Sequence, residues 1–153
     1  MIHIALVEDE ETCQKEIIGF LKAYSEEHQI PFKIDTFSSA ISFLDGYNHE
    51  YSFVFMDIQL PNLNGMDAIK KLREIDSDVL VIFVTSLAQY AITGYEVNAF
   101  DFILKPVNYY SFSVKLTRIL EKIGNEKEKQ IWVSTRNEKK LILVSKLKPS
   151  ISF

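Results

Sequence analysis

The chain of 153 residues is long enough for one domain with a full hydrophobic core and the beginning of a second. Its 47% of apolar and 25% of charged residues exclude a disordered chain, and its single cysteine, Cys13, excludes an internal disulfide and fits a reducing cytoplasm. The net charge of -4 is the sum of two unequal parts, because residues 1–124 carry 10 basic and 18 acidic side chains whereas residues 125–153 carry 7 and 3, which indicates two functional parts.

Five short apolar runs in the first 124 residues have the β-branched and aromatic composition of strands. They are residues 2–7, 32–37, 53–56, 79–84 and 100–104. Four of the five are apolar nearly throughout, as strands are when helices cover both faces of their sheet. The first run meets Glu8 and Asp9 too soon for a signal peptide or a membrane span, so we expect a cytoplasmic protein that does not enter a membrane.

Between these runs, apolar residues recur with the period of an α-helix. The clearest stripes are Cys13, Ile17, Phe20, Leu21 and Tyr24, and Phe112, Leu116, Ile119, Leu120 and Ile123; shorter candidates cover 39–47, 65–74 and 88–96. Strand and helix therefore alternate five times, which predicts right-handed parallel crossovers. The fold class that we predict is α/β, a doubly wound five-stranded parallel sheet with five helices.

The character of the sequence changes after Ile123. Residues 124–130 are polar and charged, and we interpret them as the end of a helix or a linker, with 125–130 as the linker proper. Residues 131–147 then show two apolar runs around a polar centre, which is typical of a β-hairpin. We therefore expect a short hairpin-like extension after the α/β domain.

Three acidic residues stand at the ends of predicted strands: Glu8 and Asp9 follow the first and Asp57 follows the third. In open parallel sheets the functional crevice lies at the carboxyl ends of the strands, where the strand order changes direction. With the order 2-1-3-4-5 the first and third strands are neighbours, so these carboxylates converge. Three anions in one crevice repel one another unless a cation joins them, and oxygen ligands favour Mg²⁺. The sequence thus predicts a magnesium site.

Two further residues belong to the same crevice. Thr85 offers a hydroxyl at the end of the fourth strand, and Lys105 offers an ammonium group at the end of the fifth. A divalent cation, a hydroxyl and an ammonium group around one carboxylate are an environment for phosphoryl transfer, which needs positioning and charge stabilisation more than covalent assistance. Asp57 is then the nucleophile, and the product is an aspartyl phosphate.

Each residue also has a structural interpretation. Glu8, Asp9 or Glu10 would cap the helix that follows, and Thr85 would cap a later one. Asp57 would make an Asx turn, and Lys105 would be solvated. The functional interpretation is favoured because all five fall at the same end of four different strands.

Residues 1–124 resemble the receiver domain of a two-component response regulator. The resemblance rests on "ALVEDE", "FMDIQLPNLNGMDAIKKLR", "VIFVTS" and "AFDFILKP", in this order and at family spacing. It implies a flavodoxin-like fold and a phosphoacceptor signalling protein that catalyses only its own phosphorylation and dephosphorylation. Asp57 would accept phosphate from a sensor histidine kinase. Mg²⁺ would be held by Asp9 and Asp57 directly, by Glu8 through water and by the backbone carbonyl of Gln59.

The resemblance also implies a switch. Thr85 and Lys105 would move to bind the phosphoryl group, Phe102 would turn inward behind Thr85, and Pro106 would follow Lys105 through a cis bond. A homodimer would form through the fourth helix, fifth strand and fifth helix, to which Tyr90, Tyr95, Val97 and Tyr109 contribute if they are not core residues. We expect Gly65, after the phosphoacceptor, to supply a backbone angle that other residues resist.

Residues 131–153 resemble the start of a LytTR-type DNA-binding domain, on the segment "IWVSTRNEKKLILVSKL". Most of such a domain is missing, so we expect a truncated output domain. Transcriptional control through DNA would then belong to a full-length output domain and not to this chain alone.

Three alternatives remain open. A phosphatase of the haloacid dehalogenase type wants a second aspartate two residues after the nucleophile, where this chain has Gln59. A pseudo-receiver would have lost phosphorylation and serve as a protein-interaction module, which the complete acidic set argues against. A flavodoxin would carry a phosphate loop rich in Ser and Thr after the first strand, and we find none.

Overall fold

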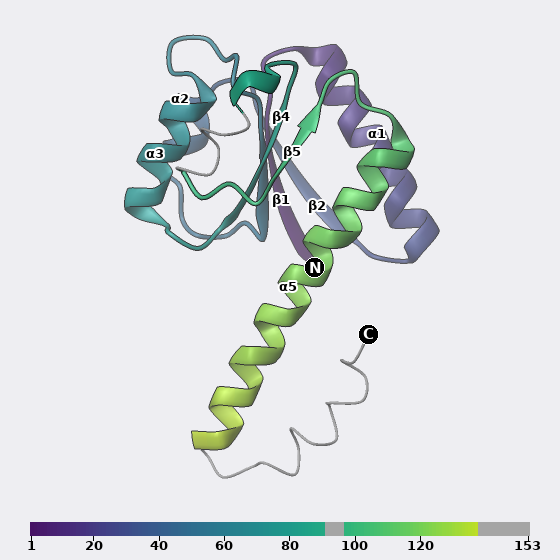
Figure 1. The fold of residues 1–153 in the computed structure, drawn as a ribbon, viewed down its shortest axis with the longest axis vertical. Coiled ribbons are helices and arrows are strands. Elements are labelled where there is room, and N and C mark those ends of the chain that lie inside the picture. Colours follow the sequence, from purple (N-terminus) through teal and green to yellow (C-terminus); the bar gives the residue numbers. More distant parts are fainter. Residues whose placement is uncertain (91–96, 138–153) are drawn as a thin grey trace. The chain divides into compact units, whose positions relative to one another are not determined.

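A computed structural model of the protein describes residues 1–90 and 97–137, with the backbone alone for residues 90 and 126–137. Its centre is a five-stranded sheet made of β1 (Ile2–Val7), β2 (Phe32–Phe37), β3 (Phe53–Met56), β4 (Leu80–Thr85) and β5 (Asp101–Leu104). All neighbouring strands are parallel. The order is β2-β1-β3-β4-β5, as the sequence predicts (Figure 1).

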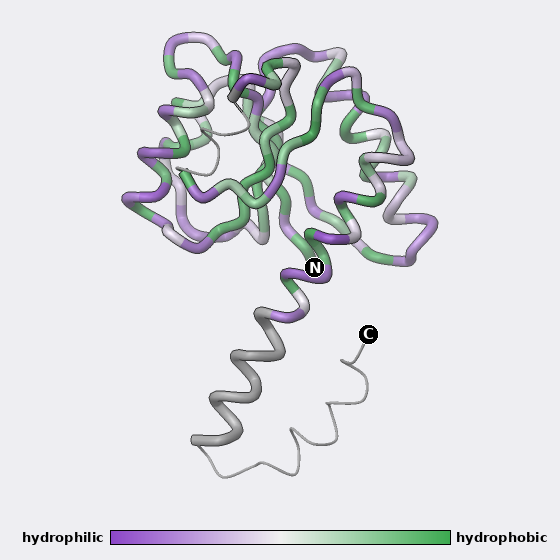
Figure 2. The backbone as a smooth tube through the Cα atoms, in the orientation of Figure 1, coloured by the Kyte–Doolittle hydropathy of each residue, from purple (hydrophilic) through white to green (hydrophobic). Residues whose placement is uncertain are grey.

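The strands form where the apolar runs lie because helices cover both faces of the sheet. All four residues of β3 and the last four of β1 are buried. Figure 2 shows the same pattern, with hydrophobic residues along the strands and hydrophilic residues on the outer surfaces of the helices. The central strands therefore fix the sheet through burial on both sides.

Four α-helices and one 3-10 helix lie within the described residues: α1 (Glu11–His28), α2 (Ala40–Leu44), α3 (Gly65–Ile75), η1 (Ala88–Tyr90) and α5 (Tyr109–Asn137). The helix that the sequence predicts over 88–96 begins as η1, and residues 91–96 lie outside the described part. No helix in the described ranges is both long and apolar enough to cross a membrane.

Side chains mark where two of the helices begin. The Ser39 hydroxyl accepts a hydrogen bond from the Ser42 N–H at the start of α2, and the Asn64 side chain accepts one from the Asp67 N–H at the start of α3. Such caps satisfy N–H groups that have no partner within the helix. The turn after β3 thus ends at a defined residue, and α3 begins directly behind the strand end.

The two faces of the sheet carry different packing. One core lies between the sheet and helices α2 and α3, where Val54, Met56 and Phe83 from the strands contact the helices. The opposite face lies toward α1, and there the Phe112 ring packs against the rings of Phe20 and Phe55 at centroid distances of 5.5 and 5.6 Å. Successive strand residues point to alternate faces, so both cores are built from the same strands.

The chain divides into two compact units, Met1–Lys115, which contains the sheet, and Leu116–Phe153, of which residues 116–137 are helical. Helix α5 continues through residues 125–137, where we expected the end of a helix or a linker over 124–130 and a strand from 131. The physical reason is that Glu, Lys and Gln are strong helix formers, so an established helix extends through them at little cost. The rest of the expected hairpin, residues 138–153, lies outside the described residues.

Candidate functional site

The site lies at the carboxyl ends of β1, β3, β4 and β5. Backbone hydrogen bonds set the two buried acids side by side: the Glu8 N–H donates to the Phe37 carbonyl at 2.9 Å, and the Asp57 N–H donates to the Val7 carbonyl at 3.0 Å. Glu8 and Asp57 therefore continue the sheet by one residue each. Both side chains are buried, and the exposed Asp9 lies beside them.

Lys105 connects the two acids. Its ammonium nitrogen lies 2.7 Å from Oε1 of Glu8 and 2.8 Å from Oδ2 of Asp57. The Glu8 and Asp57 side chains are only 3% and 4% exposed, and that of Lys105 is 17% exposed, so these charges interact with little screening by water. The backbone N–H of Lys105 donates to the Thr85 carbonyl at 2.9 Å, which holds the main chain of Lys105 beside β4.

Burial and charge act against each other in this group. Burial raises the pKa of Glu8, and the hydrogen bond from Lys105 offsets only part of that effect. For Lys105 burial alone lowers the pKa, but its hydrogen bonds to Asp57 and Glu8 outweigh burial and raise it. Lys105 is therefore charged at neutral pH and serves as a fixed positive charge between two carboxylates.

The loop after β3 fixes the Asp57 side chain and backbone. The Gln59 N–H donates to Oδ1 of Asp57 at 3.1 Å. A Cβ atom at position 65 would lie 2.1 Å from the Asp57 carbonyl oxygen, so only glycine lets α3 begin this close to the strand end. The φ angle of Gly65 is not in the left-handed region, so close approach, and not the special backbone angle that we expected, explains this glycine.

A divalent cation fits the acidic residues by their chemistry. Glu8, Asp9 and Asp57 each offer a carboxylate oxygen, and these oxygens lie within 4.8 Å of one another. Asp9 is exposed, whereas the other two are buried, so the set opens to solvent on one side. A small group of carboxylate oxygens with access to water suits Mg²⁺, which keeps several waters when bound to proteins.

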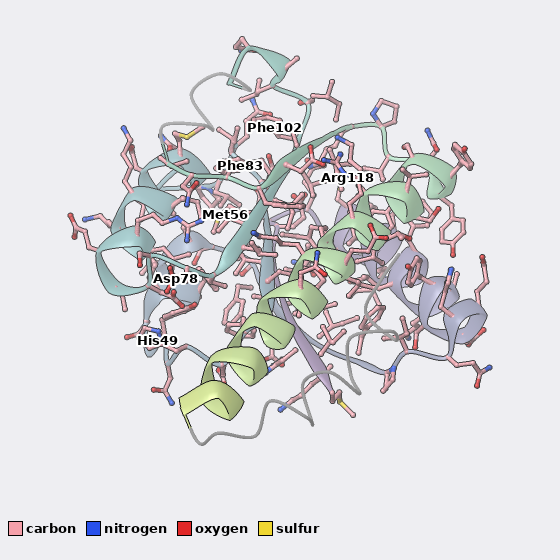
Figure 3. The ribbon with its side chains drawn as sticks, turned by 60° about the horizontal axis from the view of Figure 1, so that its bottom comes forward. His49, Met56, Asp78, Phe83, Phe102 and Arg118 are labelled. Carbon is pink, nitrogen blue, oxygen red and sulfur yellow. The ribbon has the colours of Figure 1, made fainter. Side chains whose placement is uncertain are left out.

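The predicted switch residues lie on β4, on β5 and just beyond. Thr85 is fully buried, and its hydroxyl accepts a hydrogen bond from the Leu87 N–H at 3.3 Å. The centroids of the Phe102 and Phe83 rings lie 5.4 Å apart. Figure 3 shows Phe102, Phe83 and Met56 in a row across neighbouring strands. The Lys105-Pro106 bond is cis, as the resemblance implies.

Two residues of the predicted dimer face have contacts within the domain. Val97 is buried in the core next to α3, and the Tyr109 hydroxyl donates to Glu27 of α1 at 3.1 Å. Tyr95 lies outside the described residues, and of Tyr90 only the backbone is described.

Sequence reasoning missed the contacts that hold the loop between β1 and α1, which contains Glu8, Asp9 and Glu10. The Glu10 N–H donates to Oε2 of Glu8 at 3.1 Å, and the Gln14 side-chain amide donates to the Glu8 backbone carbonyl. Gln14 stands one helical turn after Glu10, and its N–H donates to the Glu10 carbonyl. A glutamine in the first turn of a helix has no distinctive signal, because its partner is a backbone group.

Comparison with protein families gives one match over most of the chain. The family model described as "Response regulator receiver domain" matches residues 4–117. This range includes every site residue named above, from Glu8 to Pro106.

Known proteins resemble the chain in the same region. Sensory transduction protein LytT of Oceanobacillus iheyensis is 28% identical over 128 residues, which are 82% of this chain and 51% of the relative. Transcriptional regulatory protein YpdB of Escherichia coli K12 is 28% identical over 133 residues, which are 86% of this chain and 51% of the relative. The chain thus spans about half the length of these curated relatives.

A solved structure agrees with the fold. The non-phosphorylated HemR receiver domain from Leptospira biflexa superposes with a TM-score of 0.66 at 26% identity, covering 78% of this chain and 94% of that one.

Proposed function

Because the chain belongs to the response regulator receiver domain family, we propose that Asp57 accepts a phosphoryl group from a phosphohistidine of a sensor kinase, in a reaction that requires Mg²⁺. The observation that carries this proposal is the ammonium of Lys105, which lies within 2.8 Å of carboxylate oxygens of both Glu8 and Asp57 at the carboxyl edge of the sheet. A buried pair of acids that shares one cation is costly for folding. Its presence at the solvent-facing edge of the sheet indicates a chemical use.

The chain's own residues supply position and charge. An oxygen of the Asp57 carboxylate attacks phosphorus, the bond from phosphorus to the donor's nitrogen breaks, and an acyl phosphate forms on Asp57. The Gln59 N–H and the Lys105 ammonium hold the carboxylate during the attack, and Lys105 then faces the new phosphoryl oxygens. Electrostatic stabilisation of this kind is the main contribution that a protein makes to phosphoryl transfer.

The proposal assigns Mg²⁺ to Glu8, Asp9, Asp57 and the backbone carbonyl of Gln59. Bound there, the ion would neutralise charge on the transferring phosphoryl group. The three carboxylates supply oxygen ligands of the type that Mg²⁺ prefers, and Asp9 is open to solvent.

The switch residues form the second part of the proposal. The buried hydroxyl of Thr85 would give up the Leu87 N–H to bind the phosphoryl group, and the half-buried ring of Phe102 would fill the space behind it. Three exposed apolar side chains on β5 and the start of α5, Leu104, Tyr110 and Val114, support a homodimer through the fourth helix, β5 and α5.

We place transcriptional output in a DNA-binding domain of LytTR type. One of the relatives described above is named a transcriptional regulatory protein, and residues 131–147 resemble the start of such a domain. The basic charge of residues 125–153 suits contacts with phosphate groups. DNA binding would require the full output domain.

Incubation with acetyl phosphate and Mg²⁺, followed by intact-mass measurement, tests the phosphoacceptor. We expect one added phosphoryl group on the wild type, none on Asp57→Asn and none when EDTA replaces Mg²⁺. Asp45→Asn, at an exposed aspartate after α2, is the matched control and should be labelled like the wild type. An unlabelled wild type would favour the pseudo-receiver, and equal labelling of Asp57→Asn would place the phosphoryl group elsewhere.

A further inference from the structure

Strand β5 is short and open on one side. It contains four residues and stands at the end of the strand order, where β4 is its only neighbour in the described sheet. An edge strand presents unpaired N–H and C=O groups along its outer side. Because Lys105 directly follows this strand, the position of β5 also determines where the ammonium of Lys105 lies.

Backbone direction shows which residue of β5 faces outward. In a parallel ladder, the N–H and C=O groups of alternate residues point toward the neighbouring strand and away from it. The Lys105 N–H donates to the Thr85 carbonyl of β4. Ile103 therefore shares the inward direction, and both backbone groups of Phe102 point to the outer edge.

Two side chains occupy this outer edge. The Phe102 N–H donates to Oδ1 of Asp101 at 2.7 Å, and the Phe102 carbonyl accepts a hydrogen bond from the ammonium group of Lys115. The same ammonium lies 3.0 Å from Oδ1 of Asp101. Both outward groups of Phe102 are thus satisfied by side chains, and one of the two comes from α5.

The ion pair between Asp101 and Lys115 is partly buried. The side chain of Asp101 is 16% exposed and that of Lys115 is 32% exposed, so the interaction is partly shielded from water and salt. Lys115 has a second acceptor besides the carboxylate, the carbonyl of Phe102. A charged donor that also binds the main chain fixes a strand more firmly than a side-chain contact alone.

We propose that Lys115 is a positioning residue for phosphoryl acceptance: from α5 it anchors the outer edge of β5 and thereby holds the ammonium of Lys105 against Asp57. The inference rests on the proposed function of Asp57. It follows from the short path between the two lysines, because Phe102, which Lys115 binds, and Lys105 are three residues apart on one four-residue strand and its end. Displacements of about 1 Å at a reacting group are enough to slow a reaction up to about a hundredfold.

A double-mutant cycle tests the proposal. Initial rates of labelling by acetyl phosphate and Mg²⁺ are measured by intact mass for the wild type, Lys115→Met, Lys105→Ala and the double variant. We expect Lys115→Met to slow labelling about tenfold in the wild-type background. In the Lys105→Ala background we expect an effect of less than about twofold, because the group that Lys115 positions is gone.

Two further variants keep the test decisive. Lys70→Met makes the same chemical change at an exposed lysine of α3 and should leave the rate unchanged. Asp101→Asn keeps an acceptor for the Phe102 N–H but removes the charge that faces Lys115, so it should reproduce the slower labelling in smaller degree and the same dependence on Lys105. This variant also serves if Lys115→Met fails to fold.

The outcomes separate the two claims. If the wild type is labelled and Lys115→Met has no effect, or slows labelling equally with and without Lys105, Lys115 has at most a general structural role and the inference is wrong. If the wild type itself is not labelled, the proposed function fails, and the inference fails with it.

Discussion

The two ends of the parallel strands hold acids whose pKa values shift in opposite directions, the buried Glu8 at one end and the half-buried Asp76 at the other. At the carboxyl ends of the strands, burial raises the pKa of Glu8, and the hydrogen bond from Lys105 compensates only in part. At the opposite end, burial also acts to raise the pKa of Asp76, but hydrogen bonds from the Tyr47 hydroxyl and from backbone N–H groups outweigh it and lower the pKa. The proposed function uses acids of the first kind, whose charge the protein's own donors compensate only in part, whereas an acid of the second kind is a structural joint.

The carboxylate of Asp76 connects two loops, the one between α2 and β3 and the one between α3 and β4. Asp76, between α3 and β4, accepts hydrogen bonds from the Tyr47 hydroxyl at 2.8 Å and from the N–H groups of Asp78 and Val79 at 3.0 and 3.1 Å. His49 Nδ1 lies 3.2 Å from the same carboxylate. Figure 3 labels His49 and Asp78 at this end of the domain. The comparison teaches that the number of donors around a carboxylate, and not burial alone, separates a joint from a reactive site.

Loss of the Arg73 side chain, which lies at the same end of the domain as Asp76, should cause the largest loss of stability. Its guanidinium group donates to the backbone carbonyls of Asp76, Val79, Val97 and Asn98. Arg73→Met leaves these acceptors without their donor, so we expect the free energy of unfolding to fall by about 3 kcal/mol. Urea unfolding followed by circular dichroism measures the change. Lys71→Met, at an exposed neighbour on α3, is the control. A loss below about 1 kcal/mol for Arg73→Met would show that the hydrogen bonds from Arg73 to the four carbonyls are not needed for stability.

Removal of the Asp76 carboxylate should have the next largest effect. Asp76→Ala leaves the Tyr47 hydroxyl and two N–H groups without an acceptor, which costs about 2 kcal/mol near neutral pH. Because the folded protein lowers the pKa of Asp76 below 3.8, its contribution is complete above that value and is lost as the pH falls through the lower folded value.

The acid dependence supplies the measurement. Urea unfolding of the wild type and Asp76→Ala from neutral pH to below pH 3.8 should show two stabilities that converge on the acid side. Asp45→Ala, at an exposed aspartate, should run parallel to the wild type. A constant difference at every pH would assign the effect of Asp76→Ala to packing and not to its charge.

The sequence predicted the residues at the carboxyl ends of the strands but not the contacts of Asp76 and Arg73 at the opposite end, for one physical reason. Asp57, Thr85 and Lys105 each follow a recognisable apolar run, so the topology of a parallel sheet places them together once the strands are predicted. Arg73 binds backbone carbonyls as far away as Asn98, and any residue type supplies a carbonyl. Contacts of this kind leave no pattern in the sequence.

The same reasoning explains the result for α5. Residues 125–130 carry no apolar stripe, so periodicity, which reports burial, indicates a linker. Helix formation needs no burial where good helix formers extend an existing helix. Lys115 was overlooked because its acceptor is again a backbone carbonyl, that of Phe102.

Loss of the Asp57 carboxylate should have the smallest effect on stability, although it should abolish phosphorylation. In Asp57→Asn the ammonium of Lys105 keeps Glu8 as its partner at 2.7 Å, and the repulsion that Asp57 exerts on Glu8 disappears. We expect the free energy of unfolding in EDTA to stay within about 1 kcal/mol of the wild type and to increase rather than decrease. Glu8→Gln is the matched variant, because it also leaves one acid for one ammonium. If Asp57→Asn instead loses as much stability as Asp76→Ala, both ends of the strands hold their acids as structural joints, and the distinction between a reactive and a structural carboxylate does not apply to this fold.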